Sequence, residues 1–119
     1  EKLAKWKELG VAYIYNGRTK QNMPMYFQFY ENCIKFAKRL NIQNAVSKIS
    51  IPHLLVHGNE DPTVLLSEAV NIKSWNPDID LHIIDGANHV LGGFHPYALE
   101  KFPKDLQEAI DVTIKFLKG

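Results

Sequence analysis

The chain has 119 residues, of which 45% are hydrophobic and 23% are charged, and its formal net charge is +1. This length and composition are typical of one globular unit and exclude two ordinary domains. The near-neutral charge argues against nucleic acid or an anionic membrane as a partner. The single cysteine, Cys33, excludes an internal disulfide and is compatible with a reducing compartment, which favours the cytoplasm.

No stretch of this sequence is predicted to span a membrane. The longest apolar runs are far too short to cross a bilayer, and the first residues contain neither a Met nor the apolar core of a signal peptide. We therefore expect the chain to be part of a longer protein.

The first third of the sequence favours helices. Apolar residues recur at an irregular helical spacing over residues 3–15, until Asn16 and Gly17 interrupt them. After Pro24, Met and aromatic residues are crowded together. These patterns predict an opening helix over residues 3–15 and a second helix over about 26–40.

From residue 49 the pattern changes to an alternation of strands and helices. A short apolar run predicts a buried strand over 51–57, which ends in a dense group of turn residues. Apolar residues at helical spacing then predict a helix over 64–75, a second strand over 81–85, and a final helix over 106–117. The predicted order is strand, helix, strand, helix.

This order predicts a parallel pair of strands that is covered by helices. Two strands are too few for a stable sheet, and one strand edge would stay bare. We expect the missing strands to come from an amino-terminal segment absent from this sequence, or from a second copy.

Two loops carry candidate chemistry, one over residues 57–62 and one over 86–90. Loops at the carboxyl ends of neighbouring parallel strands lie side by side, so Asp61 and His89 are expected to meet. A carboxylate that accepts the imidazole N–H fixes the tautomer of the ring and stabilises the imidazolium that forms when histidine takes a proton.

Two segments of this sequence resemble the α/β-hydrolase family, particularly its serine esterases and related peptidases: IPHLLVHGNEDPTV at 51–64 and LHIIDGANHVLGG at 81–93. The resemblance implies that residues 46–119 are the carboxyl-terminal part of an α/β-hydrolase parallel sheet. It implies that Asp61 is the acid of a catalytic triad and His89 its general base, with no cofactor and no metal. Glu60 is the alternative acid.

The family's order of nucleophile, acid and histidine places the nucleophile upstream of the acid. No G-x-S-x-G occurs in this sequence, and its serines, Ser47, Ser50, Ser67 and Ser74, lack the flanking glycines of a nucleophile elbow. Cys33 falls in a predicted helix. We therefore expect the nucleophile and the oxyanion hole to lie outside these residues, and the chain alone to be inactive.

Residues 1–45 resemble the segment in which this family places a helical cap over the active site. The cluster of Met and aromatic side chains over 23–30 would line an apolar substrate pocket or pack the lid. Arg18 would hold an anionic substrate group or lie solvated on the cap surface.

Four further histidines have structural roles as their simplest interpretation. His57 is expected to be hydrogen-bonded at a strand end, while His53 and His82 are expected at packing or surface positions within strands. His95 is interpreted as a loop residue held by backbone groups, with lining of the pocket as the alternative.

The leading hypothesis is a serine hydrolase that cleaves an ester, amide or peptide substrate through an acyl-enzyme. One alternative keeps the fold but places Cys or Asp at the elbow. The other is a non-catalytic binding module of the same fold, which buries its open strand edge against a partner.

Overall fold

The computed structural model describes residues 1–17 and 19–119, and it is mixed α/β. Within these residues there are five helices, one antiparallel pair of strands and one parallel pair. The chain divides into two compact units, Glu1–Ile42 and Gln43–Gly119. The proposed role of Arg18 falls outside the described residues.

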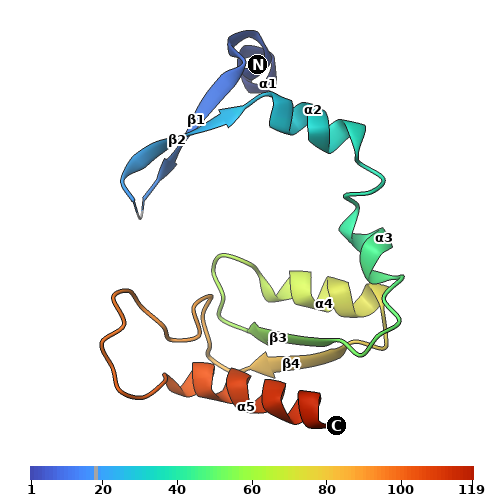
Figure 1. Ribbon diagram of the computed structural model, residues 1–119, viewed down its shortest axis with the longest axis vertical. Helices are drawn as coiled ribbons and strands as arrows, with labels where there is room; N and C mark the ends of the chain where they lie inside the picture. The colour runs from blue at the N-terminus through green and yellow to red at the C-terminus, as the bar shows by residue number, and fades with distance from the viewer. Residues whose placement is uncertain (18) are drawn as a thin grey trace. The chain divides into compact units, whose positions relative to one another are not determined.

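The first unit contains a β-hairpin between helices (Figure 1). Its elements in chain order are α1 (Lys2–Leu9), β1 (Val11–Asn16), β2 (Gln21–Tyr26) and α2 (Gln28–Lys35). The two strands are antiparallel, and Val11 pairs with Tyr26 at one end and Asn16 with Gln21 at the other.

The helix predicted over residues 3–15 is therefore wrong beyond Leu9. Gly10 has a φ of 71° and ends α1 in the left-handed conformation that glycine adopts most easily. The following run, VAYIYN, is rich in β-branched and aromatic residues, which favour a strand. Pro24 is tolerated in β2 because a strand with one partner leaves one edge free of ladder bonds.

The second predicted helix, over 26–40, is correct only for its middle part. Tyr26 is the last residue of β2, and α2 ends at Lys35, after which the chain forms turns. The expectation of a purely helical amino-terminal segment is thus wrong. Within the 23–30 cluster, Phe27 is buried against Trp6, whose ring meets it edge-on with centroids 5.4 Å apart.

The second unit has the predicted order of strand, helix, strand, helix. The elements are α3 (Ile42–Val46), which begins at the boundary between the units, and then β3 (Leu54–Gly58), α4 (Leu66–Trp75), β4 (Asp80–Ile84) and α5 (Lys104–Lys118). Strands β3 and β4 are parallel. Both helices α4 and α5 contact both strands, and Figure 1 shows them on opposite sides of the pair.

The core of this unit lies between the strands and the helix that follows them. Ile84, Ala87 and Ala109 are buried together, and the partly buried Val56 and Leu91 pack against them. This cluster joins β3, β4, the loop after β4 and α5. The carboxyl ends of both strands are consequently held in place by packing on α5.

The parallel sheet is small. In the described part of the chain, β3 and β4 pair only with each other, so each strand has one edge without a strand partner. Across residues 1–17 and 19–119, no helix is long and apolar enough to cross a membrane.

Candidate active site

The two loops that follow β3 and β4 are in direct contact. The backbone N–H of Asn59 donates to the carbonyl of Ile84 (3.2 Å), and that of Glu60 donates to the carbonyl of Ala87 (3.0 Å). At Gly58 the loops approach so closely that a Cβ atom would lie 2.2 Å from the carbonyl oxygen of Ala87. Glycine at this position is therefore a requirement of the contact between the loops.

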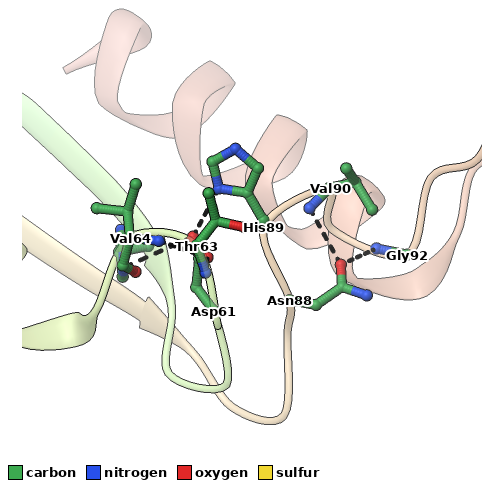
Figure 2. A network of polar contacts seen from close by, with 8 residues as sticks. Asp61, Thr63, Val64, Asn88, His89, Val90 and Gly92 are labelled. Carbon is green, nitrogen blue, oxygen red and sulfur yellow. Dashed lines mark hydrogen bonds and ion pairs between the residues drawn. The ribbon is translucent and has the colours of Figure 1, made fainter. Parts of the chain in front are cut away.

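This contact brings Asp61 and His89 together. Oδ2 of Asp61 lies 2.9 Å from Nδ1 of His89 (Figure 2). Asp61 belongs to the loop after β3 and His89 to the loop after β4. Parallel strands carry both residues to the same edge of the sheet, as the positions of the loops in the sequence predict.

The carboxylate of Asp61 is held on both oxygens. Its side chain is only 6% exposed, and Oδ1 accepts hydrogen bonds from the backbone N–H groups of Thr63 (2.8 Å) and Val64 (2.9 Å). The chain after Asp61 folds back over the carboxylate in this way, as it commonly does after aspartate in turns. Oδ2 is left facing His89 (Figure 2).

Asp61 is ionised at neutral pH. Burial alone would raise the pKa of its carboxyl, but the hydrogen bonds from Val64, His89 and Thr63 favour the charged form and lower the pKa from 3.8 to about 2. Hydrogen bonding thus outweighs desolvation at this site.

The charge of Asp61 determines which nitrogen of His89 carries hydrogen. A carboxylate only accepts hydrogen bonds, so the 2.9 Å contact requires a proton on Nδ1 of His89. In the neutral ring, Nε2 then has a free lone pair. Figure 2 shows this second ring nitrogen on the side away from Asp61, and the side chain of His89 is 50% exposed. The ring is oriented to accept a proton from a group outside the pair.

Asn88 shapes the loop that carries His89. Its Oδ1 accepts hydrogen bonds from the backbone N–H groups of Val90 (3.1 Å) and Gly92 (3.2 Å), as Figure 2 shows. Leu91, between Val90 and Gly92, has a φ of 51°, an uncommon conformation for leucine, and packs against the core. The loop is therefore anchored on both sides of His89.

A cavity of about 260 Å³ lies beside the pair. It is lined by residues of β3 and of the two loops: Val56, His57, Gly58, Asp61, Val64, Asn88, His89 and Leu91. No serine or cysteine is among these lining residues. In the described ranges, no group of three or more His, Cys, Asp or Glu side chains is arranged to hold a metal ion.

The remaining predicted residues lie as follows. His57 is 13% exposed, and its Nε2 lies 3.0 Å from the carbonyl oxygen of Val64 and 4.0 Å from Oδ2 of Asp61. Glu60, the alternative acid, is exposed and does not line the cavity; the contact with His89 is made by Asp61.

The other histidines do not contribute to the cavity lining. His82 lies in β4 and pairs with Glu108 of α5 at 2.9 Å. His53 precedes β3, and its buried Nδ1 atom has no hydrogen-bond partner among the residues that the structure describes. His95 is exposed in the loop before α5 and is not among the residues that line the cavity.

Sequence reasoning did not identify Asn59 as more than a turn residue. Its side-chain amide donates from Nδ2 to Oδ1 of Asp85 (2.8 Å) and accepts at Oδ1 from the backbone N–H of Gly86 (2.7 Å). The partner loop lies 26 and 27 positions away in the chain, and nothing in the local sequence indicates this contact.

Comparison with protein-family models gives no match to this chain, and comparison with curated proteins gives no significant match. The geometry of the two loops therefore carries the functional interpretation.

Proposed function

We propose that this chain is the carboxyl-terminal part of an α/β-hydrolase and supplies the acid and the histidine of a serine-hydrolase triad. The observation that carries the proposal is the 2.9 Å contact between Oδ2 of the buried Asp61 and Nδ1 of the half-exposed His89. The parallel order of the two strands and the resemblance of the segments 51–64 and 81–93 to this family support it. The substrate class is an ester, an amide or a peptide.

In the proposed mechanism, Nε2 of His89 takes the proton from the attacking hydroxyl group of a serine. The ring becomes an imidazolium, which the negative charge of Asp61 stabilises across the Nδ1–H hydrogen bond. Asp61 stays ionised throughout because its pKa is about 2. His89 then gives the proton to the leaving alkoxide or amine, and the acyl group remains on the serine until water removes it.

The proposal requires a nucleophile from outside these 119 residues. None of the serines of the chain lines the cavity beside His89 within the part that the structure describes. A serine at the elbow fits the proposed acid and base best, since a hydroxyl group needs a general base to become a nucleophile. Cys or Asp at the elbow would give a related hydrolase with the same two loops.

The test uses the whole polypeptide that contains this chain. A fluorophosphonate probe, which reacts with activated serines, should label it, and His89→Ala should reduce the labelling rate by at least about 100-fold. His95→Ala is the matched control, because it removes an exposed histidine from outside the cavity lining. Two results would contradict the proposal: no labelling of the parent protein by the probe, or labelling of the His89→Ala variant at the unchanged rate.

A further inference from the structure

We propose that Asn59 is a positioning residue, which joins the loop of Asp61 to the loop of His89 and thereby sets the distance between the two side chains. The effect of Asn59 on activity rests on the proposed function. Its effect on the Asp61–His89 hydrogen bond does not.

The side-chain amide of Asn59 uses both of its ends in this contact. The backbone N–H of Gly86 is only a donor, so the amide oxygen must face it, at 2.7 Å. The amide nitrogen then faces the carboxylate of Asp85, at 2.8 Å. The two partners therefore define the orientation of the amide, and no rotated form would satisfy both of them.

The contact lies where it controls the course of both loops. Asn59 precedes Asp61 by two residues in the first loop. Gly86, with a φ of 73°, is the residue at which the chain turns after β4, three residues before His89. A side chain that is hydrogen-bonded to this turn limits the directions in which the second loop can leave the strand.

Two backbone hydrogen bonds also connect the loops, from Asn59 to Ile84 and from Glu60 to Ala87. These bonds hold the two ends of the turn, Ile84 and Ala87, but neither is made to Asp85 or Gly86 between them. The Asn59 side chain supplies the additional hydrogen bonds there. Without them, the Gly86 turn is anchored to the first loop through its neighbours only.

The contact between Asn59 and Asp85 can be tested by swapping the amide and the carboxylate. Asn59→Asp keeps the acceptor for Gly86 but places a second carboxylate against Asp85, so the contact should open by charge repulsion. Asp85→Asn alone should keep the contact, because the new amide oxygen accepts from Asn59. The double variant restores a donor and an acceptor with their positions exchanged.

The measurement is hydrogen exchange of the His89 Nδ1 proton, followed by NMR in this 119-residue chain. We expect the protection of this proton to fall roughly tenfold in Asn59→Asp, about the effect of losing one ordinary hydrogen bond. It should return to within about twofold of the original value in the double variant. Asn59→Ala, which removes both contacts without adding charge, should lose protection as Asn59→Asp does.

Asn71→Asp is the matched control, because it adds the same charge at an exposed position of α4. It should leave the exchange rate unchanged. Unchanged protection in both Asn59 variants, or a double variant that stays as unprotected as Asn59→Asp, would overturn the role of Asn59. Neither result would affect the labelling experiment on the parent protein, so the two proposals fail separately.

Discussion

Nδ1 of His89 lies 2.9 Å from Oδ2 of Asp61, although 28 positions separate the two residues in the chain. The contact follows from topology: each residue lies in a loop just beyond one of two parallel, neighbouring strands. The absence of a side chain at Gly58 and the hydrogen bonds between the loops then bring the two groups within bonding distance.

If the proposed function holds, Asp61→Asn should remove most of the hydrolase activity of the whole polypeptide that contains this chain. An amide at this position offers N–H groups as well as an oxygen, and it neither requires a proton on Nδ1 of His89 nor stabilises the imidazolium. We expect the catalytic rate near neutral pH to fall by roughly 10⁴-fold, the loss known for a triad histidine in the wrong tautomer. A loss smaller than about tenfold, with an unchanged circular dichroism spectrum, would show that Asp61 is not the acid.

The low pKa of Asp61 makes stability depend on pH in a defined direction. The carboxyl has a pKa of about 2 in the folded chain and 3.8 ordinarily, so the unfolded chain binds its proton first as pH falls. The stabilisation should be complete above about pH 5 and should disappear as pH falls through 3.8 towards 2. Urea unfolding of the original chain and of Asp61→Asn, measured across this range, should give free energies of unfolding whose difference changes with pH. A constant difference would contradict the assigned shift.

Gly58→Ala should destabilise the second unit. The new methyl group would lie 2.2 Å from the carbonyl oxygen of Ala87, so the loops must separate to admit it. We expect the free energy of unfolding to fall by about 1–3 kcal/mol, as for other overpacked sites. Gly17→Ala is the control, because a Cβ atom there meets nothing within 4 Å. Equal stability of the two variants would exclude close approach at Gly58.

His57 is expected to support the loop of Asp61 through the carbonyl group of Val64. The Val64 N–H donates to Oδ1 of Asp61, while the carbonyl oxygen of the same residue lies 3.0 Å from Nε2 of His57. His57→Leu should reduce the free energy of unfolding by about 1 kcal/mol and increase hydrogen exchange of the Val64 amide. His57→Gln, whose side chain carries an N–H donor at a similar distance, should restore most of both. If His57→Leu and His57→Gln change stability and Val64 amide exchange equally, His57 contributes by packing alone.

The second unit could be predicted from the sequence because its signals are local and agree with one another. Apolar runs that end in groups of turn residues indicate the strands, and the helical spacing between them indicates the crossover. The observed bounds of the two strands differ from the predicted bounds by only a few residues. Strand β3 begins at Leu54, after Pro52, which has no N–H to donate to a ladder. The meeting of the two loops then follows from parallel topology.

The hairpin of the first unit was missed for a physical reason. Apolar residues over 3–15 fit a helical spacing only loosely, whereas the β-branched and aromatic character of the run from Val11 favours a strand. Gly10 supplied a stop signal before that run. Pro24 is unfavourable in a central strand but acceptable in a two-stranded hairpin.

Asn59 and its partners show what a sequence does not reveal at a site. A pair such as Asp61 and His89 can be expected from residue types that serve a known reaction. The role of a side chain that positions them depends on a contact between two loops, and these loops meet only after the strands have paired. Its residue type alone indicates a turn.

The measurement that tests the account most directly is the tautomer of His89, read from the ¹⁵N chemical shifts of its ring in this chain. The shifts distinguish the two neutral tautomers from the imidazolium, and the comparison is made on the neutral ring. The account predicts a proton on Nδ1, held by Asp61, and an unprotonated Nε2, and it predicts that Asp61→Ala abolishes this preference. A His89 ring protonated at Nε2 in the original chain would contradict it, because such a ring could not accept the proton of a nucleophile there.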